Sequence, residues 1–166
     1  MSVQASSIDA LTGLPTYAGL RSALNQSTAA IFLDIDGFRS VNDRLGHLAG
    51  DDLLVRLSAW LKREAAALHG LVFRVAGDEF LVLLPGRSLD EAAAIARRLV
   101  ATVSSAGLPD GVTLSAVVFL AGPELPDRLR DTLDDFAERL YQCELTAGRT
   151  RSNVVIVDVD RDTEDR

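Results

Sequence analysis

The apolar residues of the chain follow two patterns, continuous runs and stretches with helical spacing. Continuous runs are typical of strands in a buried sheet, and they cover residues 29–36, 71–84 (with one interruption), 111–122 and 153–159. Helical spacing covers residues 16–27, a short segment after Gly37, a long segment from about Asp51, and residues 88–106 and 125–148. This order of elements predicts the α/β (α+β) class, a mixed central β-sheet flanked by helices.

The second run, VFRVAGDEFLVLLP (72–85), is interrupted by Ala76, Gly77, Asp78 and Glu79, and four residues is the length of a hairpin turn. A hairpin forces at least one antiparallel pair, so the sheet is not expected to be purely parallel. Gly77 and Asp78 suit a turn for backbone reasons, but those reasons do not require Glu79. Because adjacent carboxylates repel unless a cation lies between them, the hairpin is a candidate site.

Acidic residues also end the first strand, where Asp34 and Asp36 share one face. Asp36 is expected to cap the following helix, whereas Asp34 directly follows apolar residues and needs a partner or a cation. Carboxylates such as Asp34, Asp78 and Glu79 are the oxygen ligands that Mg²⁺ takes together with nucleotide phosphates. On spacing alone, an ordinary acid-bearing hairpin is an equally good interpretation.

Polar residues surround a glycine-marked corner further along the chain, in NDRLGHLAGDD (42–52). Asn42 and Asp51 together offer an amide and a carboxylate that match the edge of a guanine base. The alternative for Asp51 is a helix N-cap. His47 is interpreted as a structural histidine.

Bulk properties limit the classes of function. The chain has 166 residues, 48% of them hydrophobic and 25% charged, which fits one soluble domain over residues 9–159 with a lead-in at 1–8 and a tail at 160–166. Neither a signal peptide nor a membrane segment is expected, and a single cysteine, Cys143, suits a packed helix residue in a cytoplasmic protein. The net charge of −7 argues against nucleic acid as a partner.

Three segments resemble successive motifs of the GGDEF domain of diguanylate cyclases: DALTGLP (9–15), DIDGFRSVNDRLGHLAGD (34–51) and RVAGDEFLVLLP (74–85). The resemblance implies a palm-like fold similar to adenylyl cyclase catalytic domains, with the active site on the antiparallel hairpin. It also implies condensation of two GTP into cyclic di-GMP with release of pyrophosphate. One GTP would bind per protomer, so a homodimer, at least transient, is expected during catalysis.

The resemblance also assigns roles by position. Asp34, Asp78 and the Ile35 carbonyl would bind Mg²⁺, or Mn²⁺ in its place. Glu79 would be a further metal ligand or would help to deprotonate the attacking hydroxyl. The substrate-binding residues implied are Phe38, Arg39, Asn42, Asp51, Gly77 and Arg149. Arg39 stands where the family usually has a phosphate-binding Lys, and Gly77 lets the backbone approach the nucleotide.

The chain departs from the family pattern at several positions. Ala76 replaces the first glycine of the signature, and Thr16-Tyr17 replaces the usual Asn-Arg. The Arg-x-x-Asp motif for product inhibition falls on Ala67 and Gly70, so no inhibitory site is expected.

The last motif is the most eroded part of the resemblance. Its phosphate-contacting Lys falls on Glu144 or Leu145, and the loss of one such contact would cost roughly 1.5–3 kcal/mol of triphosphate binding. The alternative function is therefore a catalytically weak or inactive domain that acts as a GTP-binding or protein-partner regulatory module. The domain would dimerise by itself or through a regulatory partner or a missing sensory domain.

Overall fold

The computed structural model describes residues 7–109, 111–147 and 153–157. Its helices are α1 (Tyr17–Ala23), α2 (Phe38–Leu45), α3 (His47–Ala66), α4 (Leu89–Thr102) and α5 (Leu125–Ala147), with a 3₁₀ turn at Val103–Ala106. Its strands are β1 (Thr28–Ile35), β2 (Leu71–Ala76), β3 (Glu79–Leu84), β4 (Leu114–Ala121) and β5 (Val154–Ile156). The predicted lead-in and tail lie almost wholly outside the described residues.

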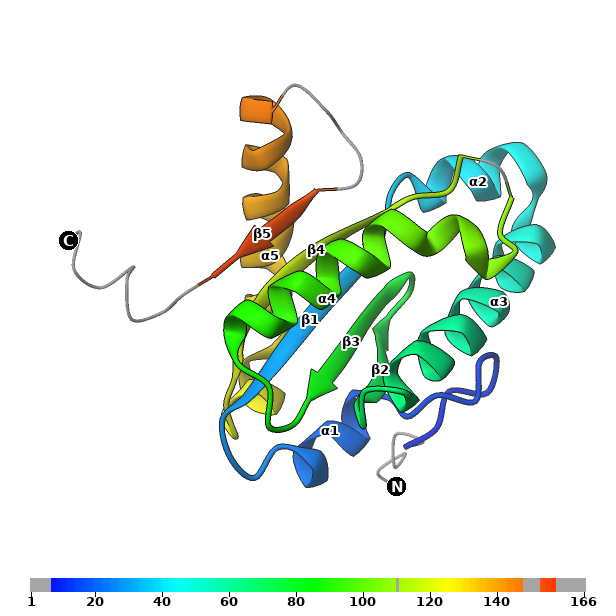
Figure 1. The fold of residues 1–166 in the computed structure, drawn as a ribbon. Coiled ribbons are helices and arrows are strands. Elements are labelled where there is room, and N and C mark those ends of the chain that lie inside the picture. The colour runs from blue at the N-terminus through cyan, green and yellow to red at the C-terminus, as the bar shows by residue number, and fades with distance from the viewer. Residues whose placement is uncertain (1–6, 110, 148–152, 158–166) are drawn as a thin grey trace.

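The five strands form one mixed sheet in the order β2-β3-β1-β4-β5. The pairs β2–β3, β3–β1 and β1–β4 are antiparallel, and β4–β5 is parallel. The predicted mixed sheet with an antiparallel hairpin is confirmed. The β2–β3 turn lies at the same end of the sheet as the end of β1 and helix α2 (Figure 1).

Helices cover both faces of the sheet (Figure 1). Alternate residues of β1 enter different cores: Ile31 and Leu33 pack toward α3 and α4, whereas Ala30 and Phe32 pack toward α1 and α5. Since side chains alternate along a strand, the same alternation places Asp34 on the face of α1 and α5.

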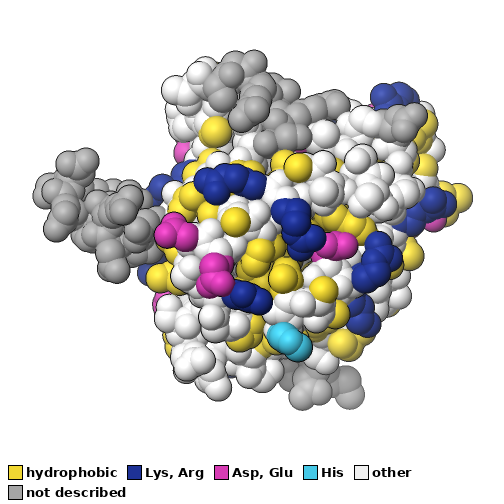
Figure 2. Space-filling view, viewed as in Figure 1, with side chains coloured by type: hydrophobic (Ala, Val, Ile, Leu, Met, Phe, Trp, Pro, Cys, Tyr) yellow, Lys and Arg dark blue, Asp and Glu magenta, His cyan; other side chains and the backbone are white. Residues whose placement is uncertain are grey.

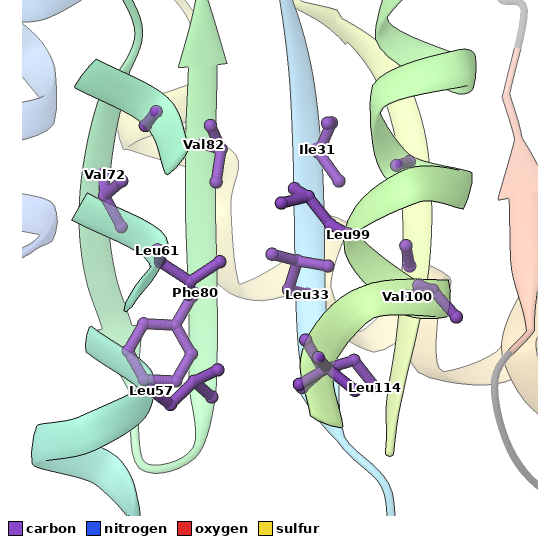
Figure 3. Packing of buried hydrophobic residues seen from close by; sticks show 14 of the residues in the cluster. Ile31, Leu33, Leu57, Leu61, Val72, Phe80, Val82, Leu99, Val100 and Leu114 are labelled. Atoms are coloured by element: carbon purple, nitrogen blue, oxygen red, sulfur yellow. The ribbon is translucent and has the colours of Figure 1, made fainter. Parts of the chain in front are cut away.

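The larger core lies between the sheet and helices α3 and α4. Figure 3 shows Leu57 and Leu61 of α3 and Leu99 of α4 packed over Leu33 and Phe80 of the central strands. These side chains are almost completely buried, so the two strands that carry Asp34 and Glu79 rest on a rigid layer.

On the opposite face, a cluster of aromatic rings attaches α5 to the sheet. The Phe136 ring of α5 lies 4.6 Å from that of Phe119 on β4 and 5.6 Å from that of Phe32 on β1, between ring centroids. Pairs at these spacings add to the free energy of burial. They fix α5 against β1 and β4.

Several predicted boundaries were wrong. Helix α3 begins at His47, four residues before the expected start at Asp51, because Gly46 alone, at φ +87°, separates it from α2. Helix α1 ends at Ala23, short of residue 27. The hairpin turn has two residues, since Ala76 already pairs with Glu79.

The start of α4 agrees with the prediction. The Ser88 hydroxyl accepts a hydrogen bond from the Glu91 amide (3.2 Å), and the Glu91 carboxylate accepts one from the Ser88 amide (2.8 Å). This reciprocal capping box ends the loop after β3 at a defined residue.

The surface over α3 and α4 carries many Lys and Arg side chains separated by apolar patches (Figure 2). Several of these arginines are neutralised by ion pairs: Arg56–Asp52 (2.7 Å), Arg87–Glu91 (3.1 Å) and Arg98–Glu64 (2.8 Å). This surface lies on the opposite side of the sheet from Asp34. Within the described ranges, no helix is long and apolar enough to cross a membrane.

Candidate active site

The centre of the candidate site is Asp34, near the end of the middle strand. In the strand register its Cα pairs with Glu79 of β3 on one side and with Ser115 of β4 on the other. Both pairings are antiparallel, so the three side chains lie on the same face of the sheet. The structure therefore brings Asp34 and Glu79 together from positions far apart in the sequence.

The turn between β2 and β3 consists of Gly77 and Asp78. Gly77 has φ +25°, a backbone conformation that favours glycine, and the register shifts between Arg74 and Ala76. A bulge of this kind bends a strand and redirects its side chains. The turn thus presents Asp78 beside the end of β1.

Arg74 connects this turn to the N-terminal motif. Its Nε donates to the Gly77 carbonyl (2.8 Å) and its guanidinium donates to the Asp9 carboxylate (2.9 Å). The Asp9 carboxylate also accepts from the amide and the hydroxyl of Thr12. Burial raises the pKa of Asp9, but the hydrogen bonds from Thr12 and Arg74 outweigh it and hold that pKa below its usual value.

The three acids of the site repel one another. Burial first, and then the charges of Asp78, Glu79 and Asp36, raise the pKa of Asp34 to about 7. Burial also raises the pKa of Asp78, although Arg74 opposes this. Burial, followed by the charges of Asp78 and of Asp134 on α5, raises the pKa of Glu79.

This arrangement fits a divalent cation completed by substrate oxygens. Among the described residues, no three His, Cys, Asp or Glu side chains converge to enclose a metal ion by themselves. Mg²⁺ usually takes only one or two carboxylates and fills its octahedron with phosphates and water. Hard oxygen donors whose mutual repulsion a cation would relieve are present at Asp34 and Asp78.

Asp36 has a different place from the one predicted. The residue before α2 is Gly37, at φ +69°, and no side chain caps this helix. The Asp36 carboxylate instead accepts hydrogen bonds from the hydroxyls of Thr113 (2.7 Å) and Ser115 (2.6 Å). The helix cap was therefore wrong, because the start of β4 offers two donors to this carboxylate. Asp36 connects the end of β1 to β4.

The predicted guanine-binding pair lies where α2 and α3 meet. Asp51 is exposed and lies inside α3, so its interpretation as an N-cap was wrong. Asn42 is half-buried, and its Oδ1 is buried without a hydrogen-bond partner in the described structure. The first residue of α3, His47, is exposed.

The remaining substrate-binding candidates lie around this corner and beyond it. Phe38, the first residue of α2, packs partly on the core, whereas the side chain of Arg39 is 95% exposed and approaches Asp43 at 3.9 Å. Arg149 lies outside the described residues, as does the side chain of Glu144. Leu145, near the end of α5, is 63% exposed.

The positions of the missing inhibitory motif differ in their surroundings. Ala67 is exposed at the end of α3. Gly70 is tightly packed, since an added Cβ would lie 2.9 Å from the Leu83 carbonyl oxygen and 3.1 Å from Leu84 Cδ2. The Asp of the family motif does not fit at this position without a shift.

Sequence reasoning missed four residues that contribute to the site. Arg74 and Asp9 occur within the quoted motifs, but their ion pair joins segments 65 residues apart. For Asp134, the sequence predicted only that it lies in a helix, and no motif connected it with Glu79. Asn153, whose backbone donates to Ser115 Oγ and accepts from Ala116, connects β5 to the same strand end.

Comparison with known proteins identifies the family. A family model described as diguanylate cyclase, GGDEF domain, matches residues 6–151. The chain therefore belongs to the GGDEF-domain family of diguanylate cyclases, and the predicted family is confirmed.

Individual relatives agree with this assignment. The chain is 33% identical over 162 residues to diguanylate cyclase DgcP of Pseudomonas aeruginosa, covering 88% of this chain and 23% of DgcP. It is 38% identical over 133 residues to diguanylate cyclase DgcM of Escherichia coli, covering 78% of this chain and 31% of DgcM. The chain thus spans about a third or less of these two relatives.

The fold agrees with a solved structure of the GGDEF domain alone, from TpbB (YfiN) of P. aeruginosa. The TM-score is 0.69 at 26% identity, and the match covers 95% of this chain and 98% of that chain. The GGDEF domain of DgcB from Caulobacter crescentus, solved in complex with c-di-GMP, has a TM-score of 0.70 at 21% identity over 94% of this chain and 96% of that one. The second likeness is one of fold.

Proposed function

We propose that this domain is a diguanylate cyclase that condenses two GTP into cyclic di-GMP and releases two pyrophosphates. The observation that carries the proposal is the crowding of Asp34 and Glu79 across β1 and β3, with Asp78 in the adjoining turn. Nothing in the packing of the sheet requires three acids there, whereas a metal–nucleotide complex uses carboxylates of this kind as ligands and as a base. Family membership supports the same conclusion.

In this proposal Asp34, Asp78 and the Ile35 carbonyl hold Mg²⁺ or Mn²⁺, with Glu79 as a further ligand or base. When bound, the ion offsets negative charge on the reacting phosphate. Glu79 takes the proton of a ribose 3′-hydroxyl, the 3′-oxygen bonds to the α-phosphorus of the other GTP, and the bond to the β-phosphate breaks. Each of the two bond-forming steps releases one pyrophosphate.

Substrate binding is proposed at the α2–α3 corner and at the turn. Asn42 and Asp51 bind the guanine, Phe38 lies beside it, and Gly77 allows close approach of the backbone. Arg39 supplies a cation to the phosphates, because its side chain is 95% exposed and reaches only a distant carboxylate. Arg149 is proposed as a second cation.

Two protomers have to face each other, because one chain offers one guanine pair and one set of acids. A homodimer, at least transient, is therefore part of the proposal. GTP is a cytoplasmic nucleotide, so we propose a cytoplasmic site of action. The net charge of −7 disfavours nucleic acid as a partner.

The alternative function is a weak or inactive GTP-binding or protein-partner regulatory module. The observation that favours it is the shortage of cations. Arg74 is committed to Asp9 and Gly77, and the usual Lys position carries Glu144 or Leu145. Triphosphate binding would be weaker than in the family, and turnover would fall with it.

The test uses α-labelled GTP with Mg²⁺ over a series of protein concentrations, with products separated by chromatography. A dimer-dependent cyclase yields cyclic di-GMP that grows more than linearly with protein. Glu79→Gln abolishes the product, whereas Glu138→Gln, an equal charge change on the exposed surface of α5, leaves it unchanged. GTP binding without product at high concentration would favour the regulatory module.

A further inference from the structure

Gly50 lies at a close contact between α2 and α3. It is buried within α3, and a Cβ added to it would lie 1.9 Å from Asn42 Oδ1 and 3.0 Å from Asn42 Cγ. Cβ atoms do not approach other atoms to 1.9 Å, so any larger residue displaces the Asn42 amide. The same Cβ would lie 3.2 Å from Phe38 Cζ.

The reason for a glycine here is space. Glycine inside a helix is unfavourable relative to alanine, and Gly50 does not have the positive φ that would require glycine. What its missing side chain provides is room for the amide of Asn42. Glycine lowers the helix propensity at this position, and the contact with the Asn42 amide requires it.

The contact also orients the amide. Oδ1 of Asn42 is the amide atom nearest to the Cβ position at Gly50, and it is buried without a partner in the described structure. Nδ2, at the other end of the amide, is not among the three atoms nearest to that position. Nδ2 is a donor, and on the guanine ring O6 and N3 are acceptors. The next residue after Gly50 is Asp51, whose exposed carboxylate is an acceptor. Donor and acceptor are therefore spaced by the α2–α3 contact itself.

We infer that Gly50 is a positioning residue for guanine recognition: it lets α2 approach α3 closely enough that the Asn42 amide presents Nδ2 beside the Asp51 carboxylate. The inference rests on the proposed function, since it assumes that guanine binds at this pair. Gly50 does not touch the base. It acts by fixing the side chain that does.

The test is Gly50→Ala, with nucleotide binding measured by calorimetry in the presence of Mg²⁺. Affinity for GTP should fall about tenfold, the loss of roughly one hydrogen bond, while binding of inorganic triphosphate, which has no base, should stay unchanged. The matched control is Gly19→Ala in α1, where the new Cβ would meet its neighbours at 3.6 Å or more. This control should bind GTP as the unmodified chain does.

A double-mutant cycle with Asn42→Ala separates positioning from general damage. Once the amide is removed, the tight neighbour that remains for the Cβ of Gly50→Ala is Phe38 Cζ at 3.2 Å, so the substitution should cause little further loss of GTP affinity. Additive losses, or unchanged GTP affinity in Gly50→Ala, would overturn the inference and leave the proposed function intact. If the unmodified chain binds no GTP, the proposed function fails, and the inference falls with it.

Folding is followed in every variant by thermal unfolding. If Gly50→Ala alone does not fold, the inference requires that the double variant with Asn42→Ala does, because the clash with the amide, at 1.9 Å, is then gone. Failure of both to fold would show that Gly50 is needed for packing in general and would overturn the positioning role.

Discussion

Asp34 and Glu79 lie directly opposite each other on the antiparallel strands β1 and β3, and neither is fully exposed. Like charges in this position destabilise a sheet. Burial and these neighbouring charges raise the pKa of Asp34 to about 7, so the metal-free fold favours its protonated form. The candidate site is thus a local cost to stability that a cation would remove.

The first prediction concerns Asp34→Asn and pH. Unfolded, Asp34 loses its proton near pH 4; folded, it does so at about 7. Because the folded state binds the proton more tightly, Asp34 contributes most to stability below pH 4, and that contribution is lost as the pH rises to about 7. Asp34→Asn should therefore be more stable than the unmodified protein at pH 8 without metal, by a few kcal/mol at most.

Thermal unfolding at pH 4 and pH 8, with and without Mg²⁺, checks this prediction. Magnesium should raise the melting temperature of the unmodified protein at pH 8, by mass action, and should have little effect on Asp34→Asn. The exposed Asp131→Asn serves as the charge-matched control. An Asp34→Asn variant that is less stable at pH 8 without metal would contradict the electrostatic account.

The second prediction concerns Arg74, whose side chain is 15% exposed and donates to both Gly77 and Asp9. Arg74→Lys keeps the charge but cannot reproduce the two-armed geometry. The lost hydrogen bonds should cost about 1.5–3 kcal/mol of stability and loosen the turn that carries Asp78. Turnover should fall more than GTP affinity.

Steady-state kinetics and thermal unfolding measure both effects. The control is Arg21→Lys, which weakens the exposed ion pair between Arg21 and Asp127 that joins α1 to α5. Exposed pairs contribute about 0–1 kcal/mol, so this variant should change little. Equal effects of the two substitutions would argue against a special role for Arg74.

The third prediction concerns feedback. Added cyclic di-GMP should not inhibit turnover through the usual motif, because Ala67 and Gly70 carry no charge. Restoring the motif should also fail: Gly70→Asp forces a Cβ to 2.9 Å from the Leu83 carbonyl oxygen, at a cost of about 1–3 kcal/mol. Ala67→Arg, at an exposed position, should be tolerated.

Both single variants and the double variant are tested for inhibition by cyclic di-GMP and for thermal stability. A double variant that is stable and inhibited would show that the backbone at Gly70 adjusts to the side chain. The expected result is a destabilised double variant whose activity does not respond to product.

The fourth prediction concerns the missing phosphate contact near the end of α5. Lys at the correct position should tighten GTP binding about 10–100-fold, the value of one charge-assisted contact. Leu145→Lys and Glu144→Lys test the two alignments. Glu138→Lys, elsewhere on the exposed surface of α5, controls for long-range attraction and should have a much smaller effect.

The sequence by itself determined the type and order of the elements and the family. Apolar runs mark β1 and β3 because both faces of these strands are covered, and the Ser88–Glu91 spacing marks the start of α4 because a capping box needs only local residues. The motifs around Asp34, Asn42 and Gly77 pointed to nucleotide chemistry for the same reason, since each is a short stretch of chain.

Only the tertiary structure decided how those stretches meet. Three features depend on contacts between separate segments. The strand register places Asp34 opposite Glu79 and Ser115. The Asp36 carboxylate bonds to β4, and the Asn42 amide packs on Gly50. Local sequence preference favoured a helix cap for both Asp36 and Asp51. Asp36 instead accepts hydrogen bonds from Thr113 and Ser115. Asp51 lies inside α3 because that helix begins directly after Gly46. A strand or helix propensity acts over a few residues, whereas the geometry of a site is set by whichever segments the core brings side by side.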